Sequence, residues 1–311
     1  MAHQFAIYSG TANPELALAL ARLTGLPFNA PEVERFPDGE LSVELLDPVR
    51  RKEVVLVQPT CPPVNEHLVE LLALADAACR ASAAHITAII PYFGYARSDK
   101  RHGRREPITA SMVALLLQAV GVDHVVTIDM HAPQLEGFFH IPVDSLTAMP
   151  TLCADLESRL PDDTVVVAPD AGAMRLATRY AQRLGTALVV LHKRRESGTE
   201  TEVTHLVGDV RDRACLIVDD MISTGGTIAR SIATLLEAGA RHEITVAATH
   251  GLLLEGAREK LTHEAVREVV VTDTMPVEVE AWPHLRVVSV APLLASALQR
   301  FMMDGSLSDL I

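Results

Sequence analysis

Two adjacent carboxylates, Asp219 and Asp220, end a short apolar run and precede a loop of small residues, 223–227. The apolar run 215–218 is short and rich in β-branched residues, which predicts a buried strand. After the loop, apolar residues recur at helical spacing. Strand, loop and helix in this order direct the loop N–H groups and the positive end of the helix dipole at one point, which predicts a phosphate site.

The two aspartates add a second requirement, because carboxylates repel phosphate and, when ionised, only accept hydrogen bonds. A sugar phosphate meets both requirements, with its phosphate in the loop and its ring hydroxyls on the carboxylates, with or without a divalent cation. The loop contains no Gly-Lys-Ser/Thr, which excludes a Walker A motif. The alternative is an ordinary glycine-rich turn with two solvated acids.

A second group of charges lies in the stretch 91–107, directly after another apolar run. This short stretch contains five clustered cations: Arg97, Lys100, Arg101, Arg104 and Arg105. In a chain with a formal net charge of −13, such a cluster favours a polyanionic ligand, and polyphosphate fits best. A solvated basic loop or a subunit contact is the alternative.

Two candidate metal ligands, His131 and Asp170, each stand just past an apolar run. In α/β sheets, ligands bind beyond the carboxyl ends of the strands. Mg²⁺ takes one or two protein ligands and leaves its other positions to water and phosphates, so the pair is compatible with a Mg²⁺ site. The alternative for His131 is a structural histidine.

The stretch 192–200 places Lys193 and Arg195 before a polar, glycine-containing run that has no apolar anchor. This composition predicts a mobile loop. Such a loop can close over a reacting phosphoryl group, exclude water and neutralise developing charge. The alternative is a surface loop with incidental charge.

A turn signal, Pro37-Asp38-Gly39, separates Phe36 from Glu40. Its simplest interpretation is a hairpin. The functional interpretation uses Phe36 as a stacking surface for a base, with Asp38 and Glu40 as hydrogen-bond acceptors.

Alternating strand and helix patterns must position these residues. The expected strands are 5–8, 41–45, 54–57, 86–91, 125–129, 165–168, 187–191, 215–218, 244–249, 269–272 and 287–290, and the expected helices are 15–23, 66–80, 111–120, 173–184, 229–238 and 293–301. This alternation predicts an α/β fold with mostly parallel sheets covered by helices. We expect the segment 141–145 to cross between two halves.

Composition limits the class of protein. A chain of 311 residues exceeds what one hydrophobic core usually serves, so we expect two domains, 1–146 and 147–311. The acidic balance argues against a nucleic-acid partner. The four cysteines are scattered without disulfide or metal spacing, and neither a signal peptide nor an apolar run of membrane-spanning length is visible. We therefore expect a cytoplasmic protein with no membrane partner.

Six motifs occur together and in order along the whole chain: FPDGE, PYFGYAR with the basic run into REPIT, DMHAPQLEGFF, APDAG, HKRRE and VDDMISTGGT. This set resembles the ribose-phosphate pyrophosphokinase family, the synthetases of phosphoribosyl pyrophosphate (PRPP). The resemblance implies two tandem type I phosphoribosyltransferase-like domains, with the active site between them. It also implies Mg²⁺-dependent transfer of the diphosphoryl group of ATP to the anomeric hydroxyl of ribose 5-phosphate, giving PRPP and AMP for nucleotide biosynthesis.

The resemblance assigns a role to each matching residue. ATP would be bound by Phe36, Asp38, Gly39, Glu40, Arg97 and Ser98. Ribose 5-phosphate would be bound by Arg195, Asp219, Asp220, Ser223, Thr224, Gly225, Gly226 and Thr227. Lys193 and Arg195 would be catalytic, and His131 and Asp170 would bind Mg²⁺. In such enzymes the loop 36–40 comes from a neighbouring subunit, so we expect a homo-oligomer, from a dimer up to a hexamer.

The sequence departs from the commonest family pattern at several positions. Ser98 stands where Gln is usual, and Ser223 and Gly225 stand where Asp and Ala are usual. Pro48 replaces a Ser that belongs to a regulatory site for phosphate and ADP in the best-known branch. This replacement argues against phosphate activation, ADP allostery and the hexamer associated with them.

Two other functions remain as alternatives. One is a non-catalytic regulatory homologue associated with PRPP synthetase, which the intact loop cations and metal ligands disfavour. The other is a phosphoribosyltransferase that consumes PRPP, which the matching first half of the chain disfavours.

Overall fold

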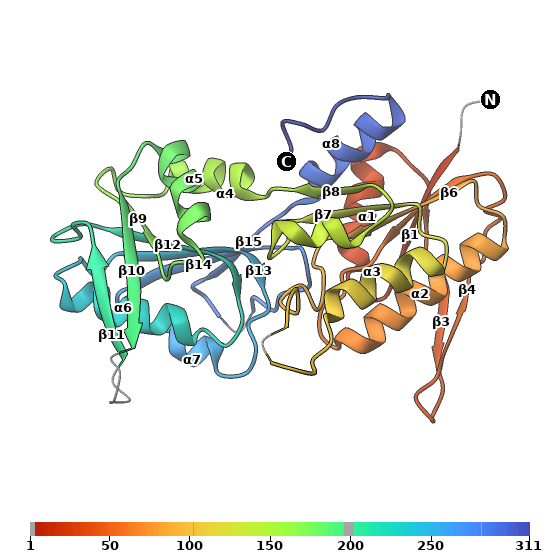
Figure 1. Ribbon diagram of the computed structural model, residues 1–311. Coiled ribbons are helices and arrows are strands. Elements are labelled where there is room, and N and C mark those ends of the chain that lie inside the picture. Colours follow the sequence, from red (N-terminus) through yellow and green to blue (C-terminus); the bar gives the residue numbers. More distant parts are fainter. Residues whose placement is uncertain (1–3, 102, 196–201, 281) are drawn as a thin grey trace. The chain divides into compact units, whose positions relative to one another are not determined.

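The computed structural model describes residues 4–101, 103–195, 202–280 and 282–311, without the side chains of 193–195 and 202–204 (Figure 1). The chain forms two compact units. The first contains Met1–Thr147, Thr274–Pro276 and Val290–Ile311, and the second contains Ala148–Asp273 and Val277–Ser289. The C-terminal segment from Val290, which the sequence led us to assign to the second domain, packs in the first unit.

The first unit is built on a six-stranded parallel sheet with the order β2-β1-β5-β6-β7-β8. Its strands are β1 (Phe5–Ser9), β2 (Phe28–Asn29), β5 (Glu53–Val57), β6 (His85–Ile90), β7 (His124–Ile128) and β8 (Val143–Leu146). Strand β8 corrects the expectation that 141–145 only crosses between two halves. Its residues Val143–Leu146 pair in parallel with Val125–Ile128 of β7 and form the edge of the sheet.

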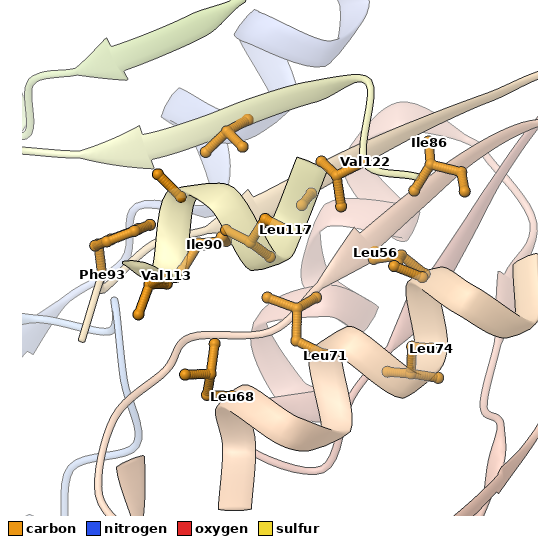
Figure 2. Packing of buried hydrophobic residues seen from close by; sticks show 14 of the residues in the cluster. Leu56, Leu68, Leu71, Leu74, Ile86, Ile90, Phe93, Val113, Leu117 and Val122 are labelled. Atoms are coloured by element: carbon orange, nitrogen blue, oxygen red, sulfur yellow. The ribbon is translucent and has the colours of Figure 1, made fainter. Parts of the chain in front are cut away.

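Helices cover both faces of this sheet. Helices α2 (Val64–Arg80) and α3 (Thr109–Ala119) pack on one face, where their leucines and valines meet alternate strand residues. Figure 2 shows this layer, which includes Leu56, Leu68, Leu71, Ile90, Val113 and Leu117. Helix α1 (Pro14–Thr24) packs beside β1, and α8 (Ala291–Met302) packs against α1.

An antiparallel hairpin of β3 (Glu32–Arg35) and β4 (Leu41–Glu44) lies outside the six-stranded sheet. The turn between its strands is closed by a hydrogen bond of 2.8 Å from the Phe36 N–H to the Glu40 carbonyl. Gly39 adopts a φ of +93°, which disfavours residues with a side chain. The hairpin interpretation of Pro37-Asp38-Gly39 is confirmed.

The second unit is built on a seven-stranded sheet with the order β11-β10-β9-β12-β13-β14-β15. Its strands are β9 (Val165–Ala168), β10 (Leu188–Arg195), β11 (Glu202–Val207), β12 (Cys215–Ile222), β13 (Ile244–Gly251), β14 (Val266–Thr272) and β15 (Leu285–Val288). Only the β10–β11 pair is antiparallel among the described strand pairs of this sheet. The prediction of mostly parallel sheets is therefore confirmed.

Helices α4 (Met149–Glu157) and α5 (Met174–Leu184) cover one face of the second sheet (Figure 1). Helices α6 (Gly226–Glu237) and α7 (Ala257–Leu261) cover the opposite face. Successive residues of β12 alternate between the layers, so that Leu216 and Val218 pack on one side and Ile217 on the other. A 3₁₀ helix, η1 (Pro133–Phe138), follows β7 in the first unit.

Two segments near the predicted site differ from the sequence expectations. Strand β12 continues four residues beyond the predicted 215–218, so both aspartates lie within the strand, and Asp219 pairs with Ala248 of β13. Strand β10 runs to Arg195 and pairs with β11, where we expected a loop from 192 onward. The rest of the expected mobile loop, residues 196–200, lies outside the described residues. In the part of the chain that the structure describes, no helix is long and apolar enough to cross a membrane.

Candidate active site

The loop 223–227 joins β12 to α6 in the second unit. Gly225 is the N-cap of α6 and has a φ of +71°, a conformation that residues with a Cβ adopt only under strain. A Cβ at this position would also lie 3.2 Å from the Leu261 side chain, which is closer than ordinary packing. The sequence Gly225-Gly226 therefore allows the tight turn that brings the helix start next to the carboxylates.

Three consecutive carbonyl groups at the end of β12 are held from the same side by one neighbouring segment. The carbonyls of Ile222, Ser223 and Thr224 accept hydrogen bonds of 3.0 Å from Leu253 N–H, Leu254 N–H and Lys260 Nζ, respectively. In a planar trans peptide the C=O and the following N–H point in opposite directions. The N–H groups of residues 223–225 therefore point away from the segment 253–260. On that opposite side an anion can accept hydrogen bonds from them.

Asp219 and Asp220 form a close acidic pair before this loop. The Asp220 N–H donates to Asp219 Oδ1 at 2.9 Å. Burial, followed by the charge of Asp220, raises the pKa of Asp219 well above its usual range. A ligand whose hydroxyl groups donate hydrogen bonds to the carboxylates, or a cation, offsets the repulsion between the two charges and the cost of burying them. This favours a polyhydroxyl ligand at the pair.

Asp170 follows β9, the parallel neighbour of β12. Its Oδ1 accepts hydrogen bonds from the N–H groups of Gly172 at 2.9 Å and Ala173 at 3.1 Å, which fix the direction of the carboxylate before α5. The charge of Asp170 also contributes to the raised pKa of Asp219. The structure thus brings Asp170 to the same edge of the sheet as the acidic pair.

Lys193 and Arg195 lie on β10, the strand on the other side of β9. Their backbones pair with Thr204 and Glu202 of β11. Their side chains lie outside the described residues, so their predicted contacts with ribose 5-phosphate and their catalytic role stay predictions.

In the first unit, the predicted nucleotide loop 36–40 is exposed at the tip of the β3–β4 hairpin. Phe36 is 40% exposed, as a stacking surface requires. Asp38 Oδ1 accepts the Glu40 N–H at 3.1 Å, which orders the turn and leaves the Glu40 side chain exposed. The geometry suits contact with a planar base.

The basic stretch 91–107 begins at the carboxyl end of β6 and is anchored by Thr60. The Thr60 hydroxyl accepts the Gly94 N–H at 2.6 Å, and a Cβ on Gly94 would lie 2.5 Å from the Thr60 carbonyl. Arg97 is exposed beyond this anchor. Ser98 Oγ accepts the N–H of Thr109 at 3.3 Å, which places Ser98 beside the first turn of α3.

His131 follows β7 and is exposed. The chain turns sharply before it, with Asp129 at a φ of +41°, and the Asp129 N–H donates to the Leu146 carbonyl at 2.8 Å. Gln134 Nε2 donates to Asp99 Oδ2 at 2.5 Å, which joins the His131 segment to the basic stretch. Both segments therefore lie at the carboxyl edge of the first sheet.

A divalent metal would have to use few protein ligands at these positions. Within the described residues, no group of three or more His, Cys, Asp and Glu side chains forms a metal cage. Mg²⁺ prefers oxygen ligands and usually keeps several waters or substrate phosphates, so a complete protein cage is not required. The oriented carboxylate of Asp170, in the second unit, is an oxygen ligand of the kind that Mg²⁺ prefers. His131 lies in the first unit and is exposed, and the role of the two residues as Mg²⁺ ligands stays a prediction.

Comparisons with known proteins show what this chain is similar to. Residues 5–121 match the family model of the N-terminal domain of ribose phosphate pyrophosphokinase, and residues 198–311 match the phosphoribosyl synthetase-associated domain. The ribose-phosphate pyrophosphokinase of Chromobacterium violaceum is 44% identical over 305 residues, covering 97% of this chain and 93% of the relative. That of Campylobacter jejuni is 42% identical over 98% of both chains.

A solved structure supports the same grouping. The crystal structure of phosphoribosylpyrophosphate synthetase from Mycobacterium smegmatis aligns with a TM-score of 0.89 and 40% identity, over 97% of this chain and 100% of that one. The chain belongs to the ribose-phosphate pyrophosphokinase family. This membership confirms the resemblance found in the motifs, the phosphoribosyltransferase-like α/β fold and the expected enzyme class, ribose-phosphate pyrophosphokinase.

Family membership leaves unassigned several residues that the structure joins to the predicted site. Lys260, which lies 33 positions after Thr227, contacts the predicted phosphate loop. Arg35 pairs with Glu70 at the base of the hairpin that carries the predicted nucleotide loop. Sequence patterns could not reveal these partners, because Lys260 reads as an ordinary exposed charge and Glu70 as a polar residue in an amphipathic helix. The adjacency of Arg35 to the FPDGE motif was the one available signal.

Proposed function

We propose that this chain transfers the diphosphoryl group of ATP to the anomeric hydroxyl of ribose 5-phosphate, producing PRPP and AMP. The observation that carries the proposal is the loop 223–227. The carbonyls of residues 222–224 are held by hydrogen bonds from the segment 253–260, the N–H groups of residues 223–225 face away from that segment, and an acidic pair precedes the loop. Phosphate and ring hydroxyls are the two features that such a site selects together.

On the sugar side, residues 223–227 bind the 5-phosphate through backbone N–H groups, hydroxyls and the start of α6. Asp219 and Asp220 accept hydrogen bonds from the ring hydroxyls. This arrangement fixes the sugar at both ends, so that the anomeric hydroxyl keeps one orientation.

On the nucleotide side, Phe36 stacks on the base, while Asp38, Gly39 and Glu40 supply its polar contacts. Arg97 and Ser98 contact the polyphosphate. The exposed cations of the stretch 97–105 support this assignment, since they concentrate positive charge in a chain that is acidic overall.

Mg²⁺ is assigned to His131 and Asp170. When bound, Mg²⁺ supplies charge neutralisation for the phosphoryl oxygens and orients the polyphosphate. The carboxylate of Asp170, held by two backbone N–H groups, is ready to serve as a ligand without reorganisation.

Lys193 and Arg195 supply the cations that stabilise the transferring group. Phosphoryl transfer depends on alignment and charge stabilisation more than on covalent chemistry by the protein, so two well-placed cations account for much of the rate. We name no residue as general base.

The working form is a homo-oligomer in the cytoplasm. Helix α3 supports this assembly, because Met112, Leu115 and Leu116 on its surface are 46%, 53% and 39% exposed. An apolar patch of this kind is characteristic of a protein–protein contact.

The deciding experiment incubates the purified chain with Mg²⁺, ATP and ribose 5-phosphate and follows AMP and PRPP by chromatography. Equal amounts of AMP and PRPP are expected. The second candidate, a regulatory homologue, predicts no AMP at any phosphate concentration. Release of pyrophosphate from added PRPP and a base, without AMP formation from ATP, would instead identify a phosphoribosyltransferase. Varying inorganic phosphate and ADP in the same assay tests the expectation that Pro48 accompanies a loss of regulation.

A further inference from the structure

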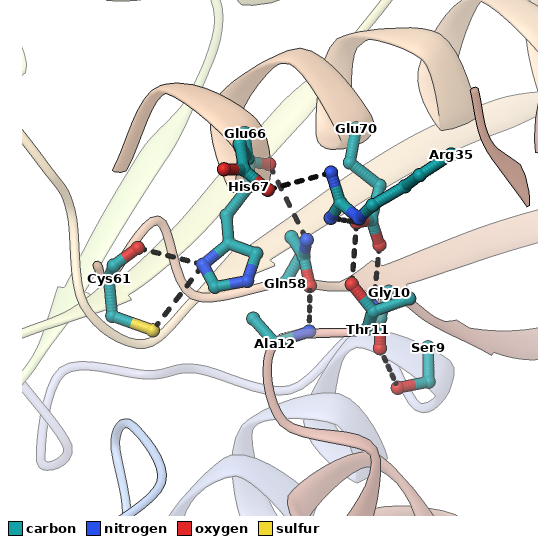
Figure 3. A network of polar contacts seen from close by, with 10 residues as sticks. All are labelled: Ser9, Gly10, Thr11, Ala12, Arg35, Gln58, Cys61, Glu66, His67 and Glu70. Carbon is teal, nitrogen blue, oxygen red and sulfur yellow. Dashed lines mark hydrogen bonds and ion pairs between the residues drawn. The ribbon is translucent and has the colours of Figure 1, made fainter. Parts of the chain in front are cut away.

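A fully buried carboxylate lies in α2, at Glu70, outside all the residues assigned to substrates. Its side chain is 0% exposed, and burying a charge is costly unless partners compensate it. Glu70 Oε1 accepts the Thr11 N–H at 2.5 Å, and Oε2 accepts the Thr11 hydroxyl at 2.6 Å and Arg35 Nη2 at 3.2 Å. Figure 3 shows these groups converging on the carboxylate.

Arg35 bridges two acids on the same face of α2. Its Nη1 contacts Glu66 Oε2 at 2.9 Å while its Nη2 contacts Glu70, one helical turn further on. The planar guanidinium can hold two carboxylates at once, which a single ammonium cannot do with the same geometry. The exposed Glu66 contact is worth little by itself, and the buried Glu70 contact is the stronger one.

The bridge matters because Arg35 lies next to the predicted nucleotide loop. Arg35 is the last residue of β3 and is bonded directly to Phe36, the first residue of the nucleotide loop. The β3–β4 hairpin is a separate two-stranded sheet, so no ladder of the six-stranded sheet fixes it. An isolated two-stranded hairpin is marginally stable, and its tip needs other contacts to keep one position.

The opposite end of the bridge is rigid. Thr11 lies in the turn between β1 and α1, and the next N–H, that of Ala12, donates to the fully buried Gln58 Oε1 at 3.0 Å. A Cβ at Gly10 would lie 2.2 Å from the same oxygen, so a larger residue in this turn would displace the Gln58 side chain. Glu70 therefore connects the hairpin to a turn that is itself fixed against the main sheet.

We propose that Glu70, acting through Arg35, is a positioning residue that holds the loop 36–40 in its nucleotide-binding conformation. The inference rests on the proposed assignment of this loop to ATP. A loop that is already ordered loses less conformational entropy when the nucleotide binds, so the bridge contributes to ATP affinity without touching ATP.

The test compares Arg35→Met with the wild type, because Arg35 is partly exposed and methionine retains much of its apolar stem. We expect the KM for ATP to rise about ten-fold, the change that ~1.4 kcal/mol of lost preorganisation produces. The kcat and the KM for ribose 5-phosphate should stay within about two-fold, since neither the transferring group nor the sugar site is altered. Arg22→Met, which removes an exposed arginine from α1, serves as the control and should change none of these values.

Conservative variants separate positioning from general stability. Arg35→Lys should recover part of the ATP affinity, because one cation can still pair with Glu70. Glu66→Gln should have a smaller effect than Arg35→Met, and Glu70→Gln should resemble Arg35→Met if its thermal unfolding shows a folded protein. Equal increases in the KM values of both substrates, or an unchanged KM for ATP in folded Arg35→Met, would overturn the proposal.

Titration calorimetry with Mg-ATP alone measures nucleotide binding without catalysis, so it tests the positioning role independently of the proposed reaction. Weaker Mg-ATP binding by Arg35→Met than by the wild type supports the bridge even if no AMP is formed. If the wild type forms AMP while both proteins bind Mg-ATP equally, the proposed function stands and the positioning role is wrong.

Discussion

The ammonium group of Lys260 donates a hydrogen bond of 3.0 Å to the carbonyl of Thr224, two residues before the first turn of α6. It completes a row in which the two preceding carbonyls are held by main-chain N–H groups. Of these three donors, only that of Lys260 belongs to a side chain. The orientation of the Thr224–Gly225 peptide, whose N–H we propose faces the 5-phosphate, therefore depends on a residue that can be substituted.

Lys260→Met is expected to raise the KM for ribose 5-phosphate about five-fold, because a net hydrogen bond contributes ~1 kcal/mol and a nearby positive charge is lost as well. The KM for ATP should change little. The matched control is Arg258→Met, which removes a cation from the same short helix. Steady-state kinetics with each substrate varied in turn provides the measurement. Equal effects of the two substitutions would mean that Lys260 acts only through net charge.

The Lys260 contact also marks the limit of prediction from sequence. The strand, the acidic pair and the glycine loop were predictable, because apolar patterning and turn chemistry are local properties. The donors from 253–260 were not, since they depend on how the chain after β13 returns to the end of β12. Leu253, which supplies one of them, has a φ of +43°, a conformation that its residue type disfavours.

The strand boundaries show the same division between local and tertiary information. The sequence predicted 215–218 as a strand, because the apolar residues end at Val218. Strand β12 nevertheless continues to Ile222, since its backbone keeps pairing with the fully buried β13 regardless of the two charged side chains. Likewise, β8 was missed because Pro142 and Asp144 obscure its apolar pattern.

Asp219→Asn tests the sugar side of the site. The substitution keeps the shape of the side chain but replaces one acceptor with an amide donor, so hydrogen bonds to ring hydroxyls are weakened. We expect the KM for ribose 5-phosphate to rise at least about ten-fold, the effect of losing a charged hydrogen bond of ~1.5–3 kcal/mol. The KM for ATP should be nearly unchanged. A selective loss of ATP affinity instead would show that the sugar and nucleotide subsites are reversed.

The raised pKa of Asp219 predicts a pH-dependent contribution to stability. The folded chain retains the proton at pH values where the unfolded chain has released it, so this group makes folding less favourable as pH rises through that window. At pH values below the ordinary aspartate pKa, Asp219 is protonated in both the folded and the unfolded chain, so the wild type and Asp219→Asn should have nearly the same stability. Asp219→Asn should therefore gain stability relative to the wild type as the pH rises above about 4, the ordinary aspartate pKa, and the gain should grow until the folded wild type also releases the proton.

Urea unfolding of both proteins at several pH values, without Mg²⁺ or substrates, measures this difference. Asp162→Asn is a suitable control, because Asp162 is exposed. A stability difference that is constant with pH would mean that the Asp219 carboxyl is ionised in the folded chain as readily as in the unfolded one. Added ribose 5-phosphate should stabilise the wild type more than Asp219→Asn, since we propose that its ring hydroxyls donate hydrogen bonds to the ionised carboxylate.

Lys193→Ala tests the cation on β10. If the side chain stabilises charge that develops on the transferring group, its loss reduces kcat by about two to three orders of magnitude, as removal of other transition-state donors does. Nucleotide and sugar binding should remain nearly intact, because those interactions are made in the ground state. Single-turnover assays for the chemical step, with Mg-ATP affinity measured separately by calorimetry, distinguish the two effects. Parallel losses in affinity and turnover would place Lys193 in substrate binding, whereas an unchanged kcat would remove it from the reaction altogether.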